Sequence, residues 1–153
     1  MSACLEPEPT LRRMRPGDVE GVMRVECAAY AFPWTSGIFR DCMRVGYGCW
    51  GLECNRRLVG HSVISVAAGE AHLLNLTIDV DHQGQGLGRF LLRSMVAEAR
   101  LEGAQTVFLE ARPSNLAALG LYHTEGFSRV GTRPRYYPGE DEREDAWVFS
   151  IRP

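Results

Sequence analysis

A glycine-rich turn at residues 83–89 joins two different sequence patterns and constrains the fold more than any other segment. Before it, residues 49–80 carry β-branched runs separated by turn residues, which is typical of successive strands. After it, apolar side chains recur at helical spacing from Leu87 to Ala99, and Gly103 stands where a helix commonly ends. The turn must therefore lead from a strand into a helix with one apolar stripe.

The remaining patterns predict more helices and strands. Val19, Val22, Met23, Cys27 and Tyr30 recur at helical spacing after a turn at residues 16–18, and Thr35 or Ser36 can cap a short helix that runs to about Arg44. Further on, we expect strands at residues 49–54, 58–67, 71–80, 106–111, 127–137 and 146–151 and a helix at 115–124. The first three strands would form an antiparallel meander. This order predicts an α+β or α/β domain built around a mixed sheet.

Size and charge limit the kinds of protein that this chain can be. Its 153 residues, 45% of them hydrophobic and 24% charged, predict one domain spanning residues 1–153. No apolar run approaches the roughly 18 residues of a membrane helix, and the first residues lack the layout of a signal peptide. A net charge of −2 gives no footprint for direct binding of nucleic acid. We therefore expect a cytoplasmic protein with neither membrane nor nucleic acid as a partner.

The cysteines and histidines give no metal-binding pattern. The five cysteines are odd in number and lack two-residue spacing, so we expect reduced thiols, mostly in the core. They are Cys4, Cys27, Cys42, Cys49 and Cys54. The four histidines never fall at the spacing of a helical zinc motif. We expect no metal site.

The glycine-rich turn can bind a phosphate, because backbone N–H groups and the positive end of the helix dipole meet there. All 17 basic residues are arginine, which excludes a phosphate loop that requires lysine. A dinucleotide fingerprint fits Gly84 and Gly86, and Glu110 follows at a suitable distance, but Arg89 stands at the third glycine position. From these residues alone, a phosphate site and a purely structural turn remain equally open.

The segment Gln83-x-x-Gly86-x-Gly88 resembles the pyrophosphate-binding motif of the GCN5-related N-acetyltransferase (GNAT) family. Further motifs extend the resemblance over most of the chain, to the members that acetylate the N-terminal alanine of bacterial ribosomal proteins. They are Phe32-Pro33-Trp34, Asn75-Leu76-Thr77-Ile78-Asp79, Leu109-Glu110-Ala111-Arg112, Ser114-Asn115-x-Ala117-Ala118, Leu121-Tyr122, Gly126-Phe127 and Tyr136-Tyr137-Pro138. The resemblance implies a mixed, mostly antiparallel central sheet flanked by helices, and transfer of an acetyl group from acetyl-coenzyme A to a protein N-terminus.

The resemblance also implies a role for particular residues. Glu110 would be the general base and Tyr122 the general acid of a direct transfer in a ternary complex. The residues implied to hold the cofactor are Leu76, Thr77 and Ile78 along the pantetheine arm, Gly84, Gln85, Gly86, Leu87, Gly88 and Arg89 at the pyrophosphate, and Asn115. Two positions depart from the family pattern: Gly84 replaces a frequent Arg or Lys, which removes a phosphate contact, and Val80 replaces a frequent Pro.

Without the resemblance, the catalytic candidates have plain structural interpretations. The position of Glu110 is also typical of an ordinary exposed acid at a strand end. Tyr122 lies seven residues after Asn115 on the same side of a helix, which is also typical of a core position. The acidic run at residues 140–145 either attracts a basic substrate segment or forms a charged hairpin exposed to solvent. An acetyltransferase of a small amine and a non-catalytic acyl-coenzyme A sensor are the alternative functions.

Overall fold

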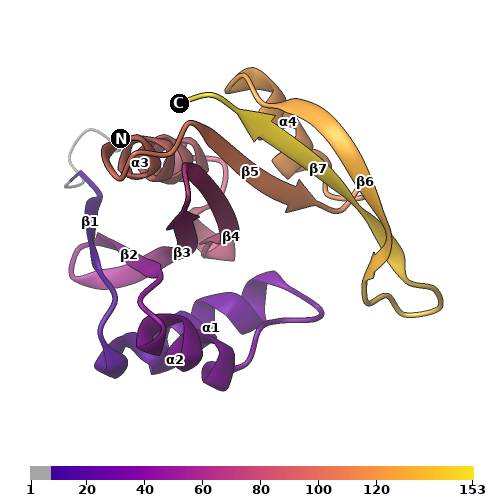
Figure 1. The fold of residues 1–153 in the computed structure, drawn as a ribbon. Coiled ribbons are helices and arrows are strands. Elements are labelled where there is room, and N and C mark those ends of the chain that lie inside the picture. Colours follow the sequence, from indigo (N-terminus) through magenta and orange to yellow (C-terminus); the bar gives the residue numbers. More distant parts are fainter. Residues whose placement is uncertain (1–7) are drawn as a thin grey trace. The chain divides into compact units, whose positions relative to one another are not determined.

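Seven β-strands form one mixed sheet in the computed structural model, which describes residues 8–153, and four α-helices accompany them in that part of the chain (Figure 1). The strand order is β1-β2-β3-β4-β5-β7-β6. The elements are β1 (Thr10–Arg13), η2 (Pro16–Asp18), α1 (Val19–Ala29), α2 (Ser36–Arg44), β2 (Gly48–Cys54), β3 (Arg57–Ala67), β4 (Glu70–Ile78), η3 (Val80–His82), α3 (Leu87–Leu101), β5 (Thr106–Ala111), α4 (Leu116–Thr124), β6 (Ser128–Tyr137) and β7 (Glu144–Ile151), where η2 and η3 are short 3-10 helices.

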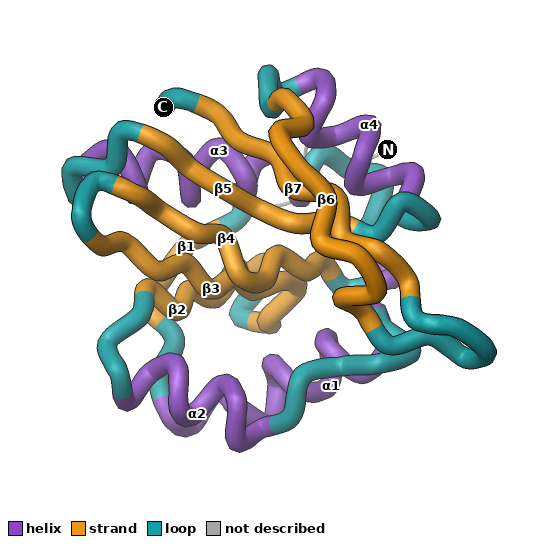
Figure 2. The backbone as a smooth tube through the Cα atoms, turned by 45° about the vertical axis from the view of Figure 1, so that its right-hand side comes forward, coloured by secondary structure: helices purple, strands orange, loops and turns teal. Residues whose placement is uncertain are grey.

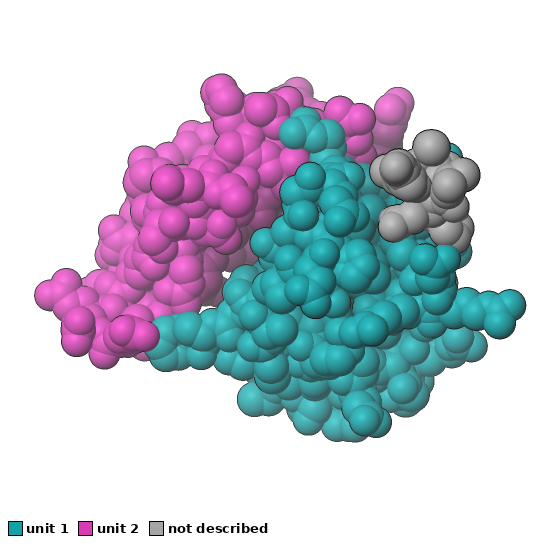
Figure 3. All heavy atoms as spheres, turned by 180° about the vertical axis from the view of Figure 1, so that it is seen from behind, with its two compact units in different colours: residues 1–64, 75–92 teal, residues 65–74, 93–153 magenta. Residues whose placement is uncertain are grey.

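The chain divides into two compact units (Figure 3). Unit 1 contains residues 1–64 and 75–92, and unit 2 contains residues 65–74 and 93–153. The chain passes from one unit to the other inside β3, β4 and α3.

In unit 1, β2 pairs antiparallel with both β1 and β3. The turn between β2 and β3 is made by Asn55 and Arg56, whose φ angles of 54° and 65° suit a tight hairpin. Helices α1 and α2 contact each other and bury Val22, Val25 and Phe39 completely. Burial of such side chains stabilises a core by about 1.5–3 kcal/mol each.

In unit 2, strands β5, β7 and β6 lie side by side (Figure 2), and the strands pair in both directions. The first part of β4 runs parallel to β5, with Glu70 opposite Thr106 and Leu73 opposite Leu109. Strand β7 pairs antiparallel with both β5 and β6. The mixed, mostly antiparallel sheet flanked by helices is therefore confirmed.

The predicted helices and strands are confirmed apart from some details. Strand β1 was not expected, because four residues with a single large apolar side chain carry no clear pattern and the strand is defined by pairing with β2. Strand β4 ends at Ile78 because the next residue, Asp79, caps η3, with its side chain accepting a hydrogen bond from the Asp81 N–H at 3.3 Å.

The expectation that Cys27 is buried needs correction. In α1 the buried residues are Val19, Val22, Val25 and Glu26, whereas Cys27 is exposed. Cys42 and Cys49 are buried as expected, Cys54 is half-buried, and Cys4 lies outside the described residues. Between residues 8 and 153, no helix combines the length and apolar character needed to cross a membrane.

Candidate functional site

The glycine-rich turn of unit 1 presents open backbone at the start of α3. Gly84 and Gly86 have φ angles of 77° and 84°, a left-handed conformation that favours glycine. A Cβ atom added at either position would meet nothing within 4 Å. The Phe90 N–H bonds to the Gly86 carbonyl at 3.0 Å, so the N–H groups of residues 87–89 precede the helical hydrogen bonds. This arrangement can bind an anion such as a pyrophosphate.

The end of β4, also in unit 1, is tied to its neighbours through its carbonyl groups. Gln83 donates from Nε2 to the Ile78 carbonyl at 3.0 Å, and the Tyr30 hydroxyl lies 3.1 Å from the Leu76 carbonyl. Thr77 and Ile78 are buried, while Leu76 is half-buried. The side chain of Gln83 thus links the proposed pantetheine strand to the turn that begins the phosphate motif.

A buried polar network lies beside this strand and was not predicted from the sequence. The Glu26 carboxylate lies 2.8 Å from His61 Nε2 and accepts hydrogen bonds from the Trp34 N–H at 3.0 Å and from Asn75 Nδ2 at 3.2 Å. Glu26 is 1% exposed and His61 0%. Burial raises the pKa of Glu26, but hydrogen bonds from His61 and Trp34 outweigh it, so its pKa lies below the ordinary value.

The spacing of α1 carries the signal that would have found Glu26. It lies four residues after Val22 and seven after Val19, so it falls on the buried face of the helix. An acid at that position requires hydrogen-bond partners, because a buried charge without them is strongly unfavourable.

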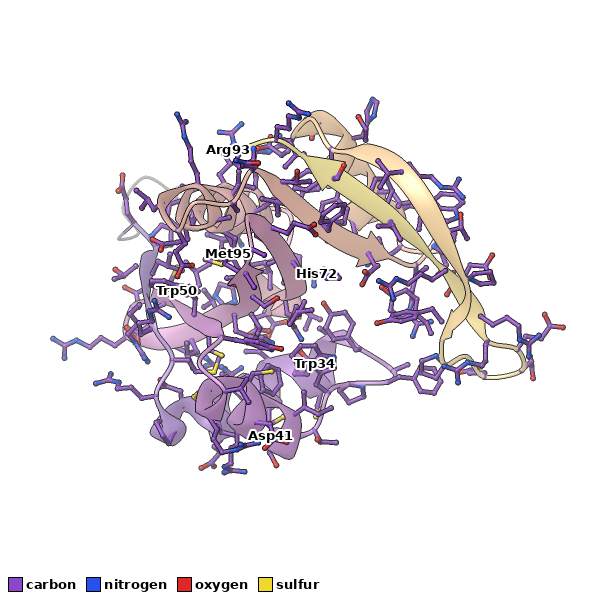
Figure 4. The ribbon with its side chains drawn as sticks, in the orientation of Figure 1. Trp34, Asp41, Trp50, His72, Arg93 and Met95 are labelled. Atoms are coloured by element: carbon purple, nitrogen blue, oxygen red, sulfur yellow. The ribbon has the colours of Figure 1, made fainter. Side chains whose placement is uncertain are left out.

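In unit 2, Glu110 lies near the end of β5, and only 10% of its side chain is exposed. Its Oε1 atom lies 2.8 Å from Nε2 of His72, which Figure 4 labels on β4, and 3.6 Å from Nε of Arg133 on β6. The distance between His72 Nε2 and Glu110 Oε1 is that of a hydrogen bond, but the two groups are not aligned as a hydrogen bond requires. Neither His72 Nε2 nor Glu110 Oε1 has an aligned hydrogen-bond partner within residues 8–153. Glu110 is therefore a largely buried carboxylate with polar neighbours rather than the exposed acid of the structural interpretation.

Asn115 and Tyr122 both lie at α4 of unit 2 and have clear structural roles. Asn115 caps the helix, with Oδ1 accepting a hydrogen bond from the Ala118 N–H at 3.2 Å, which leaves the side-chain amide to donate. Tyr122 is 7% exposed, and its ring packs against Phe127 and Phe149 with centroids 5.9 and 6.0 Å away. These roles are compatible with the implied ones, which stay predictions.

Part of the acidic run, all of it in unit 2, is used within the fold. Glu144 accepts hydrogen bonds from the Ser114 hydroxyl at 2.9 Å and from Arg112 at 3.2 Å. These contacts, that of Ser114 foremost, lower the pKa of Glu144. Asp145 accepts a hydrogen bond from the Arg135 N–H at 2.9 Å. Residues 140–142 of the run are all exposed.

Comparisons with known proteins agree with the motifs. A model of the acetyltransferase (GNAT) family matches residues 19–127. The [ribosomal protein bS18]-alanine N-acetyltransferase of Escherichia coli strain K12 is 35% identical over 142 residues, covering 93% of this chain and 96% of the relative. Its counterpart of the same name in Haemophilus influenzae is 33% identical over 134 residues, covering 87% and 91%.

The structures agree as well. The crystal structure of the ribosomal-protein-S18-alanine N-acetyltransferase from Escherichia coli superimposes with a TM-score of 0.88 and 34% identity, over 95% of this chain and 94% of that one. The match to the family model includes both the glycine-rich turn and the strand before it. The chain belongs to the acetyltransferase (GNAT) family.

Proposed function

We propose that this chain transfers the acetyl group of acetyl-coenzyme A to the N-terminal α-amine of a protein that begins with alanine, with a bS18-type ribosomal protein as its substrate. The observation that carries the proposal is the match, over nearly the full length of both chains, to relatives named for that reaction. Ribosomal proteins are made in the cytoplasm, so we place the reaction there.

We also propose that residues 1–153 work as one domain. The family model extends over segments of both units, and β3, β4 and α3 each run continuously from one unit into the other. A domain boundary normally falls in an exposed linker rather than inside three regular elements.

The cofactor would be bound mainly by backbone. In this proposal the turn Gly84, Gln85, Gly86, Leu87, Gly88 and Arg89 holds the pyrophosphate, while Leu76, Thr77 and Ile78 pair with the pantetheine arm and Asn115 donates from its amide. The open space at Gly84 and Gly86 supports this assignment, because a phosphate needs close access to N–H groups. Arg89 adds a positive charge at the same turn.

The chemistry requires one base and one acid. The amine must lose a proton before its nitrogen forms a bond to the thioester carbon, and the sulfur must gain a proton as the C–S bond breaks. We assign the first task to Glu110 and the second to Tyr122, whose phenol is protonated at neutral pH in its ordinary form. The position of Glu110 near the end of β5, where a strand-end carboxylate can take up a proton, supports its role.

Acetyl-coenzyme A should stabilise the protein, and Gly86→Leu should abolish this effect, because the new side chain would occupy the phosphate space. At a ligand concentration 100 times Kd the stabilisation is about 2.7 kcal/mol, or roughly 5–10 °C in Tm. The matched control is Gly103→Leu, since Gly103 has a similar φ of 88° and equal open space. Both substitutions place a side chain at a left-handed φ angle, so they should destabilise the fold to a similar extent. Only Gly86→Leu should lose the thermal shift. A full shift in Gly86→Leu would exclude this turn as the phosphate site.

A peptide that starts with alanine and contains an internal lysine should be acetylated at its α-amine. An α-amine with pKa near 7.8 needs about 3.5 kcal/mol less for deprotonation than a lysine with pKa near 10.4. Fragmentation mass spectrometry would locate the acetyl group, and a peptide whose N-terminus is already blocked is the control. The blocked peptide should react at least roughly 100-fold more slowly, in line with that difference. Acetylation of the lysine in both peptides would contradict the proposed acceptor.

A further inference from the structure

We propose that His72 is a positioning residue for Glu110 and takes up, at Nε2, the proton that Glu110 removes from the amine. This inference rests on the proposed acetyl transfer. It is carried by the 2.8 Å approach of His72 Nε2 to Glu110 Oε1.

The pairing of β4 with β5 fixes this approach. His72 lies opposite Phe108 in the parallel register, and Glu110 follows two residues later in β5. Side chains two residues apart in a strand point to the same face. The burial patterns agree, since Ala71, Leu73 and Leu109 on the opposite face are more fully buried than His72 and Glu110. All of these residues belong to unit 2.

The two side chains differ in access to water. The side chain of His72 is 31% exposed and that of Glu110 only 10%. The two contacting atoms are themselves buried and lack aligned partners in the described chain, so a proton moving between them displaces no existing hydrogen bond of either atom. The imidazole therefore extends from a largely buried carboxylate toward solvent.

The other groups around Glu110 do not offer this path. Arg133 lies 3.6 Å from the same oxygen, but a guanidinium keeps its proton at every relevant pH and cannot take up another. The β7 residue paired with Glu110 is Val148, which is uncharged. Residues 65–67 of β3, also in unit 2, carry no charge. Imidazole is the side chain best suited to exchange protons near neutral pH.

The proton balance of the reaction requires a path by which one proton leaves the site. An ammonium substrate and a thioester give an amide, a thiol and one free proton. The nitrogen loses two protons in all, the C–N bond forms, and the C–S bond breaks with its electron pair on sulfur. One of the two nitrogen protons balances the proton that Tyr122 gives to the thiolate, so the other must leave once per turnover. Glu110 passes it to His72 Nε2, and the imidazolium releases it to water.

The test compares His72→Ala, His72→Gln and the control His123→Ala, in which an exposed histidine of α4 is removed. Steady-state acetylation of an alanine-starting peptide is measured with and without added imidazole. We expect His72→Ala to lower kcat about 10- to 100-fold, less than loss of the base itself, with little change in KM. Added imidazole should restore part of the kcat of His72→Ala, while wild type and His123→Ala should not respond.

His72→Gln keeps a polar side chain of similar length but cannot carry a proton. It should be as slow as His72→Ala and should not respond to imidazole. A kcat within twofold of wild type in His72→Gln would overturn the inference. A slow His72→Ala that imidazole does not rescue would overturn it as well. In both cases an active wild type would leave the proposed function intact. A wild type inactive on every peptide would instead overturn the proposed function, and this inference with it.

Discussion

Glu110→Gln is expected to slow acetyl transfer roughly 10²- to 10⁴-fold, the usual contribution of a general base. The amide has nearly the shape of the carboxylate but cannot accept the amine proton. The thermal shift caused by acetyl-coenzyme A should persist, because residues 84–89 of the proposed phosphate site are unchanged. Glu102→Gln, an exposed acid just after α3 in the same unit, is the matched control and should keep wild-type turnover.

Tyr122→Phe serves as the companion variant for the same prediction. The ring of Tyr122 packs against Phe127 and Phe149, so a phenylalanine can keep that packing and the fold. Loss of the hydroxyl should slow transfer by a similar factor, because the thiolate would leave without a proton donor. Turnover close to that of wild type in either variant would remove that residue from the mechanism.

The largest expected change in stability is that of Glu26→Ala. This variant leaves His61 and the side chain of Asn75 buried without the carboxylate that they contact. Breaking a buried pair from one side costs about 3–5 kcal/mol, which urea denaturation would measure as a lower midpoint. Glu20→Ala, an exposed acid in the first turn of the same helix, should cost less than about 1 kcal/mol. Equal losses in the two variants would show that the Glu26 network does not stabilise unit 1.

The same carboxylate makes stability depend on pH. Because the pKa of Glu26 is lowered in the folded protein, its contribution is present above the unfolded value of about 4.3. It is lost as pH falls from there through the folded pKa. Denaturation of wild type and Glu26→Gln at several pH values should therefore show a steeper loss of stability in wild type below pH ~4.3. Parallel curves would contradict the lowered pKa.

Much of the fold could be predicted because its patterns are local. The stripe from Leu87 to Ala99, the Thr35 cap and the turn glycines each determine structure within a few residues. β1 could not be predicted in this way, since it is defined by pairing with β2 about forty residues later. The parallel pairing of β4 with β5 is equally non-local.

The candidate site shows the same division. The glycine-rich turn has a local signature, and the motif resemblance named Glu110 and Tyr122. No sequence pattern indicated that His72 would lie beside Glu110, because that contact depends on the register of two strands 38 residues apart at these positions. Glu144 likewise looked like part of a solvated acidic run, but it contacts Ser114 and Arg112 in the fold.

The acceptor that we propose is the α-amine of a protein beginning with alanine. The most direct test is competition: an alanine-starting peptide with the sequence of a bS18 N-terminus is mixed with free lysine, a polyamine and an aminoglycoside, and acetyl-coenzyme A is added. Mass spectrometry of all products gives the relative kcat/KM for each acceptor. The proposed function predicts that the peptide α-amine has the largest kcat/KM, whereas preferential acetylation of a small amine, with the peptide left unmodified, would contradict it.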